Sequence, residues 1–217
     1  MRVDPTQKLD ISLTEIVPEY YSSNPIVAWL FHKRLNLAVS LLRKTGARNI
    51  VDVGCGDGSL IALLQDENYQ YDHLYGVDLN PGVLTLKEKF SNCHLEVQDI
   101  MNLTLPQKYF DTVLCLDTLE HIKNIDYAIE ELKKIIVPEG HLITSEPVES
   151  ILYKTLRFLL KGTYSQESGP GAGKHYYNAR EIDAIIRSHG FQMSKMYRIP
   201  FIYPFDLFNI TLYRLKS

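Results

Sequence analysis

Three glycines at alternate positions follow a short apolar run in the segment VDVGCGDG at 51–58. Glycine lets a chain turn sharply after a strand, and it lets a ligand approach the backbone where a Cβ would collide. In dinucleotide-binding loops the glycines are spaced GxGxxG, and the following helix points its amino terminus at a pyrophosphate. Here the third glycine comes one residue early. Alone, the segment fits either a ligand-binding loop or a structural strand-to-helix turn.

Acidic residues close the next two predicted strands. Asp78 ends the run YGVD, and Asp99 follows the apolar run at 95–98. A carboxylate at the carboxyl end of the strand beside a glycine loop can accept hydrogen bonds from both hydroxyls of a ribose. Asp99 could accept from an adenine amine while Ile100 packs on the adenine ring. Three consecutive strands that end in a glycine loop, in Asp78 and in Asp99 predict a nucleoside-containing ligand.

The elements that must position these residues alternate between strand and helix, which predicts an α/β fold with a parallel sheet wrapped by helices. Five strand-helix steps are expected between Asn49 and Ser145, with Pro138–Gly140 ending a helix before the strand HLITS. Helices are expected at 26–42 and 126–136, after Asn80-Pro81, and after Asn178 in a capping-box-like start. The predicted strands are 50–53, 74–77, 95–98, 111–116, 141–145, 191–197 and 207–215.

Composition excludes several classes of protein. The chain has 217 residues, of which 45% are hydrophobic and 23% charged, as in a soluble globular protein with one main core. A net charge of −3 and the lack of a Lys/Arg run argue against a nucleic-acid partner. The three cysteines show no CxxC spacing, which suits neither a disulfide framework nor a zinc site. Without a signal peptide or a membrane-length apolar run, the expected location is the cytoplasm.

Together the motifs resemble the class I S-adenosylmethionine-dependent methyltransferases, in particular the small-molecule group with a DVGCG loop and an LEH segment. The matching segments are VDVGCGDG, GVDLN, QDI, FDTVLCLDTLEHI and the later KHYYNAREIDAIIRSHGF. The resemblance implies a Rossmann-like, doubly wound, seven-stranded sheet, mostly parallel with an antiparallel last strand. It also implies S-adenosylmethionine as cofactor and S-adenosylhomocysteine as product. Residues 1–145 hold 20 acidic and 13 basic residues, and this excess of acid suits a ligand with a sulfonium and an ammonium but no phosphate.

Residue by residue, the resemblance implies a cofactor site at the ends of the first four strands. Asp78 would hold the ribose, Asp99 would hold the adenine amine, and Asp52 would face the methionine amine or brace the loop. The other implied cofactor contacts are Gly54, Cys55, Gly56, Gly58, Leu79, Ile100, Leu116, Asp117 and, from the N-terminal region, Tyr21. A guanidinium such as Arg34 could also meet the methionine carboxylate.

His121, with Glu120 beside it, is the candidate general base for a hydroxyl acceptor, because imidazole titrates near neutral pH. The same LEH segment could instead only fix a loop and the start of a helix. Asp117, Glu120 and His121 also resemble the acidic-acidic-His metal cluster of small-RNA 2′-O-methyltransferases and some quinone O-methyltransferases, with His175 as a possible further ligand. The main prediction is a site without a metal.

The acceptor is expected under a cover at about 147–178, where His175, Tyr176 and Tyr177 follow a glycine-rich loop. The predicted domain organisation is an N-terminal helical cap at 1–45 followed by the methyltransferase domain at 46–217. Residues 150–161 form a basic amphipathic segment that either packs on the core or touches a membrane peripherally. The predicted activity is methyl transfer to a small-molecule acceptor, most readily at oxygen. The alternatives are a nucleic-acid or protein methyltransferase and a non-catalytic cofactor-binding module; the oligomeric state is left open.

Overall fold

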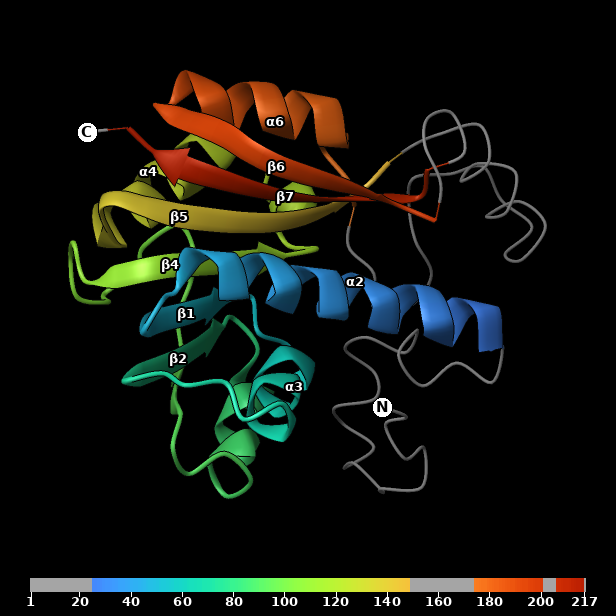
Figure 1. The fold of residues 1–217 in the computed structure, drawn as a ribbon. Helices are drawn as coiled ribbons and strands as arrows, with labels where there is room; N and C mark the ends of the chain where they lie inside the picture. The colour runs from blue at the N-terminus through green and yellow to red at the C-terminus, as the bar shows by residue number, and fades with distance from the viewer. Residues whose placement is uncertain (1–24, 149–173, 201–205, 217) are drawn as a thin grey trace.

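A seven-stranded sheet forms the centre of the computed structural model, which describes residues 25–148, 174–200 and 206–216 (Figure 1). The strands lie in the order β3-β2-β1-β4-β5-β7-β6. Strands β1 to β5 are parallel, whereas β7 is antiparallel to both β5 and β6. The predicted fold class is therefore confirmed. The strand bounds are β1 (Asn49–Val53), β2 (His73–Asp78), β3 (His94–Val97), β4 (Phe110–Leu116), β5 (Ile136–Pro147), β6 (Phe191–Ile199) and β7 (Phe208–Leu215).

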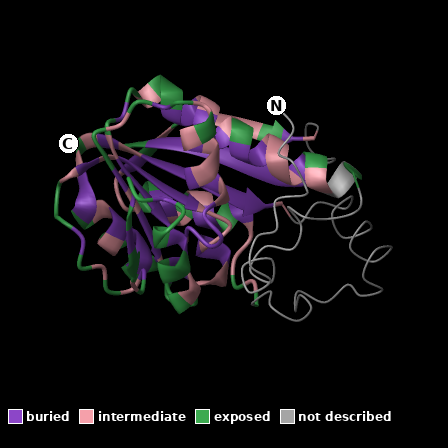
Figure 2. Cartoon of the chain, turned by 90° about the horizontal axis from the view of Figure 1, so that it is seen from below, coloured by how far each residue is buried: buried purple, intermediate pink, exposed green. Residues whose placement is uncertain are grey.

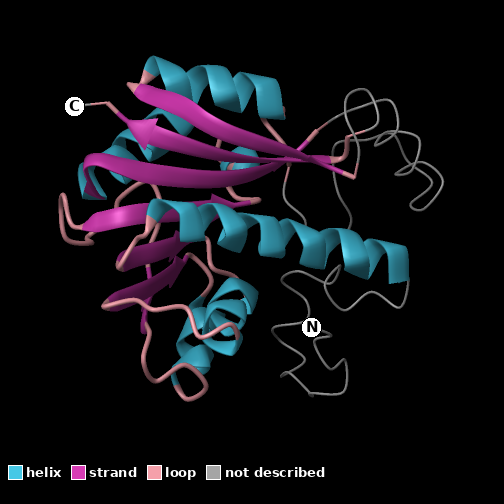
Figure 3. Ribbon diagram, in the orientation of Figure 1, coloured by secondary structure: helices cyan, strands magenta, loops and turns pink. Residues whose placement is uncertain are grey.

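Helices cover both faces of the sheet (Figure 3). Helices α2 (Pro25–Thr45) and α3 (Ser59–Asp66) pack on one face, in a core cluster that includes Leu42, Ile50 and Leu114. Helices α4 (Ile125–Ile135) and α6 (Ala179–Ser188) pack on the other face. Figure 2 shows the central strands buried between these two layers, whereas the edge strands β3 and β6 are largely exposed or half-buried. No helix in the described ranges combines the length and apolar character of a membrane span.

Local capping explains where several elements begin. The Asn178 side chain accepts the backbone N–H groups of Arg180 and Glu181, and the Glu181 carboxylate accepts the Asn178 N–H, so the predicted capping box at the start of α6 is confirmed. Asn80 accepts the Gly82 N–H at 2.9 Å and opens η2 (Pro81–Lys87), a 3₁₀ helix. A second short 3₁₀ helix, η3 (Leu119–His121), follows β4.

The structure corrects the predicted boundary between α4 and β5. Helix α4 ends at Ile135, and Ile136 already has extended backbone angles and pairs with Phe110 of β4. The ladder shifts register between Phe110 and Thr112, and Glu139 has a positive φ of 65°. The Pro138–Gly140 segment is therefore an irregularity within β5, because pairing to β4 continues on both sides of it.

One of the five expected strand-helix steps lacks its helix. Residues 98–109, between β3 and β4, contain no helix. Side chains hold this segment instead: Asp99 accepts the Met101 N–H, and Gln98 accepts the Thr104 N–H, each at 2.9 Å. Such local side-chain hydrogen bonds offer the backbone an alternative to a helix.

Candidate functional site

The glycine loop lies between the carboxyl ends of β2 and β4. The N–H groups of Gly54 and Cys55 both donate to the Val77 carbonyl, at 2.8 and 3.1 Å, and so attach the loop to β2. Gly54 has φ of 81°, and a Cβ there would lie 2.2 Å from the Thr118 hydroxyl oxygen. Gly58, with φ of 74°, precedes the first residue of α3. The loop is thus held by backbone contacts that leave no space for a side chain at Gly54.

Asp78 joins the loop to the end of β2. Its carboxylate accepts the Gly56 N–H on one oxygen and the Asn80 N–H on the other, both at 2.8 Å. Each carboxylate oxygen can accept a further hydrogen bond. The adjacent Leu79 is 68% exposed, which is unusual for leucine and leaves its side chain available to a ligand.

A second carboxyl group lies under the loop. Asp52, in β1, is buried, and its Oδ1 has no hydrogen-bond partner within the described residues. Burial, reinforced by the negative charges of Asp78 and Asp57, raises the pKa of Asp52 to about 8. The carboxyl groups of Asp52, Asp57 and Asp78 thus gather around the loop, an arrangement that favours a positively charged ligand.

An Asp52→Asn variant is expected to be more stable than the parent at pH 8, by an amount on the order of a few kcal/mol, and about as stable at pH 4. The folded chain holds the Asp52 proton up to about pH 8, whereas the unfolded carboxyl has an ordinary pKa of 3.8 and loses the proton there. The stability contributed by the bound proton is present at low pH and is lost as the pH rises toward 8. Urea unfolding at both pH values measures the difference.

Asp72→Asn provides the control, because Asp72 is an exposed carboxylate whose pKa is lowered by its hydrogen bond to Arg48. Its replacement is expected to leave the stability at pH 8 nearly unchanged or slightly lower. Equal pH dependence in the parent and in Asp52→Asn would contradict the assigned protonation.

The next predicted contacts are spread along the same edge of the sheet. Asp99 is exposed, and one of its oxygens accepts the Met101 N–H. Ile100 is only 7% exposed and packs in the core cluster below α4, so little of its surface remains for a ligand. Leu116, the last residue of β4, is partly buried against the opposite cluster.

Asp117 is held from two sides at the tip of β4. It has a positive φ of 52°, its N–H donates to the Ser145 carbonyl at 2.8 Å, and its carboxylate accepts the Ser145 hydroxyl at 3.2 Å. The carboxylate also forms an ion pair with Arg34 of α2. The buried Arg34 guanidinium lies 4.3 and 4.6 Å from the ring centroids of Phe31 and Phe208. Helix α2 therefore reaches directly into the site.

Glu120, His121 and His175 come together beside Asp117, although His175 is far away in sequence. One potential ligand atom from each of the three lies within 4.8 Å of the others, and the two imidazole rings are 4.8 Å apart between centroids. Burial, followed by the nearby Asp117 carboxylate, raises the pKa of Glu120 well above its usual range. Carboxylate and imidazole are suitable ligands for a divalent cation, so this cluster could hold one.

The segment after His175 is tied to η3 and to the residues just after it by two hydrogen bonds. The Tyr176 N–H donates to the Glu120 carbonyl at 2.8 Å, and the Tyr177 hydroxyl donates to the Lys123 carbonyl at 2.9 Å. The Tyr176 side chain remains 43% exposed. The structure thus brings His175, Tyr176 and Tyr177 to the catalytic candidates. Tyr21, the helix expected at 150–161 and most of the predicted cover lie outside the described residues.

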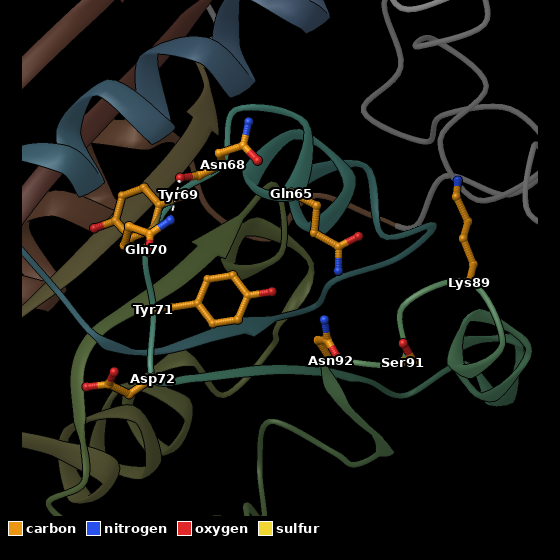
Figure 4. Close-up of a pocket in the computed structure, with 9 residues that line it drawn as sticks. All are labelled: Gln65, Asn68, Tyr69, Gln70, Tyr71, Asp72, Lys89, Ser91 and Asn92. Carbon is orange, nitrogen blue, oxygen red and sulfur yellow. Dashed lines mark hydrogen bonds between the residues drawn. The ribbon is translucent and has the colours of Figure 1, made fainter.

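A polar hollow elsewhere in the molecule contains none of the predicted residues (Figure 4). It lies between the end of α3 and the segments that precede β2 and β3, lined by side chains such as Gln70, Tyr71 and Asn92. This is the amino edge of the parallel strands, whereas ligands of open α/β sheets bind at the carboxyl edge.

Two buried charged residues lie at the carboxyl edge beyond the predicted site. Glu146 was not predicted from the sequence, and Arg34 was named only as a possible contact. Glu146 follows the HLITS segment of β5 and could have been found by the same signal that identified Asp78, an acid at the end of a parallel strand. Arg34 has no comparable local signal, because its partners Asp117 and Phe208 lie far away along the chain.

Comparisons with known proteins identify the domain family. A family model described as "Methyltransferase domain" matches residues 28–195. The probable polyketide synthase 41 of Dictyostelium discoideum is 27% identical over 161 residues, covering 61% of this chain but only 6% of that protein. The ubiquinone biosynthesis O-methyltransferase of Alkalilimnicola ehrlichii is 26% identical over 172 residues, covering 71% of this chain and 68% of the relative.

Among solved structures, magnesium protoporphyrin IX methyltransferase from Synechocystis PCC 6803, with S-adenosylhomocysteine bound, superposes with a TM-score of 0.70. The match covers 94% of each chain at 20% sequence identity. At this identity the likeness supports the fold.

Proposed function

Because this chain belongs to the methyltransferase domain family, we propose that its carboxyl-edge site transfers a methyl group from S-adenosylmethionine to an oxygen of a small molecule. The enzyme class, an S-adenosylmethionine-dependent methyltransferase, follows from the family. The choice of oxygen is carried by one observation, the imidazole of His121 beside Glu120 and His175 at the end of β4. It is supported by the likeness to an O-methyltransferase of ubiquinone biosynthesis.

The residues around the glycine loop fit the cofactor. We assign the ribose hydroxyls to Asp78, whose two oxygens each retain acceptor capacity beyond the loop contacts. The unpartnered Asp52 carboxyl suits the positive charge of the methionine end. Asp99 and the exposed Leu79 are assigned to the adenine, and Leu116 and Asp117 to the methionine end. Gly54 and Gly56 provide backbone that a ligand can approach closely.

Little covalent chemistry is required of the protein itself. When bound, the cofactor supplies a methyl group on a sulfonium sulfur, and the carbon-sulfur bond breaks as the acceptor oxygen bonds to that carbon. The chain must align the acceptor, exclude water and accept the hydroxyl proton. We assign the proton to His121, and we assign acceptor contacts to His175, Tyr176 and Tyr177, which the backbone bond from Tyr176 to Glu120 holds next to it.

The assignment is tested by incubating the chain with methyl-labelled S-adenosylmethionine and a panel of phenols, alcohols, amines and carboxylic acids. The expected result is labelled ether from a hydroxylated acceptor, with one equivalent of S-adenosylhomocysteine formed. Methylation of amines alone would overturn the choice of oxygen. Cofactor binding by calorimetry without turnover on any acceptor would point to a binding module instead.

A second candidate mechanism is favoured by the convergence of Glu120, His121 and His175. A divalent cation held there would polarise the acceptor hydroxyl and lower its pKa. The cluster fits such an ion, since it combines one carboxylate and two imidazoles and the buried Glu120 Oε2 has no hydrogen-bond partner within the described residues. In this mechanism His121 is a ligand and not the base.

Metal binding is expected to raise the melting temperature of chelator-treated protein by several degrees when Mg²⁺, Mn²⁺ or Zn²⁺ is added, if the cluster is a metal site. A His175→Ala variant should then lose this stabilisation. His189→Asn is the control, because His189 also lies near two acids, Asp126 and Glu130, at 3.6 and 3.8 Å, but away from the site. No shift with any of the three ions, together with full activity in chelator, would exclude the metal mechanism.

A further inference from the structure

Thr118 lies between the glycine loop and the segment that carries His121. It follows Asp117 at the tip of β4 and directly precedes the first residue of η3. A Cβ added at Gly54 would lie 2.2, 2.9 and 3.1 Å from the Oγ1, Cγ2 and Cβ atoms of Thr118. The Thr118 side chain therefore fills the space that glycine leaves free at position 54, and it packs the start of η3 against the loop.

The orientation of this side chain differs from that of most threonines at the start of a helix. Thr118 is the N-cap residue of η3, where a threonine hydroxyl commonly accepts a backbone N–H of the first turn. Within the described chain its hydroxyl makes no such bond. It donates instead to the Leu116 carbonyl at 3.0 Å, and the Cys115 thiol is a further hydrogen-bond partner. The side chain is thus fixed against Gly54 and not turned toward η3.

Both sides of this contact belong to the proposed site. On one side, the loop that begins at Gly54 continues to Gly56, whose N–H donates to the Asp78 carboxylate at 2.8 Å. On the other side, the His121 N–H donates to the Thr118 carbonyl at 3.1 Å, so Thr118 and the assigned base share one short turn. A shift of Thr118 relative to Gly54 therefore moves the His121 imidazole relative to a cofactor bound at the loop.

We propose that Thr118 is a positioning residue for methyl transfer: its contact with Gly54 sets the separation between the cofactor at the glycine loop and the acceptor at η3. This inference rests on the proposed O-methyltransferase function. The acceptor oxygen, the methyl carbon and the sulfur must be in line for the transfer, and a misplacement of about 1 Å can lower a rate about 100-fold. We assign no ligand contact to Thr118, so it acts through the loop and η3.

Thr118→Ala is expected to slow single-turnover methyl transfer about 10- to 100-fold at saturating cofactor and acceptor. The KM for the acceptor and the Kd for the cofactor should stay within about threefold of the parent, because no assigned contact is lost. Thr118→Ser restores the hydroxyl and its bond to the Leu116 carbonyl, and it should return the rate to within about threefold of the parent. If Thr118→Ala does not fold, Thr118→Val is measured in its place, with a loss of about 10-fold expected, because it keeps the branched shape but not the hydroxyl.

Thr112→Ala is the matched control, because it removes the same atoms from a threonine on β4. Thr112 is buried and its hydroxyl donates to the Thr45 hydroxyl at 3.0 Å, but it lies in the first half of the strand, away from the site. This variant should melt lower than the parent and transfer the methyl group at the rate of the parent. A lower melting temperature with an unchanged rate in Thr118→Ala as well, or a loss confined to cofactor affinity, would overturn the proposal.

Hydrogen exchange tests the contact without any acceptor. Saturating S-adenosylhomocysteine should slow exchange of the His121 N–H about 10-fold in the parent, because an occupied loop holds Thr118 and, through its carbonyl, the turn of η3. At equal occupancy the slowing should fall below about threefold in Thr118→Ala and persist in Thr112→Ala. Equal slowing in the parent and in Thr118→Ala, or none in the parent, would overturn the proposal. If the parent binds the cofactor but methylates no acceptor, the proposed reaction fails, and this measurement still decides whether Thr118 couples the loop to η3.

Discussion

An Asp78→Ala variant is expected to bind S-adenosylmethionine about 100-fold more weakly than the parent chain, or worse. Two hydrogen bonds from ribose hydroxyls to a carboxylate contribute about 3 kcal/mol together, and about 1.4 kcal/mol corresponds to a factor of ten in affinity. Asp78 also accepts the Gly56 and Asn80 N–H groups, so its loss loosens the glycine loop as well. Isothermal calorimetry with S-adenosylmethionine and S-adenosylhomocysteine measures the effect.

Two further variants separate the ribose contact from the loop contact. Asp78→Asn retains one acceptor oxygen and is expected to fall between the parent and Asp78→Ala. Asp99→Ala removes an exposed carboxylate at the next strand and should cost only about 10-fold in affinity, equivalent to a single hydrogen bond. Unchanged affinity in Asp78→Ala, with a melting temperature equal to that of the parent, would remove the ribose assignment.

A His121→Ala variant is expected to lose turnover by about 10²- to 10⁴-fold, the range typical for removal of a general acid or base. Cofactor affinity should change little, because His121, in η3, is not an assigned cofactor contact: those contacts lie on β1, the glycine loop, β2, the segment after β3 and the tip of β4. Single-turnover methyl transfer with saturating cofactor and acceptor measures the chemical step, and calorimetry measures cofactor binding.

Tyr177→Phe serves as the control for disturbance of this segment, because its hydroxyl bonds only a backbone carbonyl, that of Lys123, among the described residues. Because Tyr177 is also an assigned acceptor contact, the variant should lower stability slightly and raise the KM for the acceptor, while the chemical step at saturating acceptor stays within about threefold of the parent. Full activity in His121→Ala would make His121 a structural residue. Loss of metal-dependent stabilisation in the same variant would instead favour its role as a ligand.

The parts of the site that were predictable from sequence are those encoded locally. A glycine run after a strand, and an acid at the end of the next strand, each appear within a few residues, and parallel strands necessarily bring such ends to one edge. This is why Asp52, Gly54 and Asp78 could be placed together before their contacts were known. The irregular start of β5 was not predictable, because it depends on pairing with Phe110.

Contacts between distant segments carried no such signal. Arg34 lies in a helix whose periodicity shows only that it is amphipathic, and its burial between Phe31 and Phe208 depends on how α2 crosses the sheet. The same holds for His175, whose proximity to His121 depends on the hydrogen bond between Tyr176 and Glu120. Sequence proposed His175 as a possible partner, but only the packing shows the two rings together.

The reversed direction of β7 divides that strand into two stretches that should tolerate mutation differently. Its opening residues, Phe208 and Asn209, reach the edge where Arg34 and Glu146 lie, whereas Arg214 pairs with His141 far down the ladder. In saturation mutagenesis along β7, substitutions near the start of the strand should therefore lower catalytic activity. Substitutions near its end should lower only the yield of folded enzyme. Directed evolution toward new acceptors would do best to randomise the start of this strand and leave its end untouched.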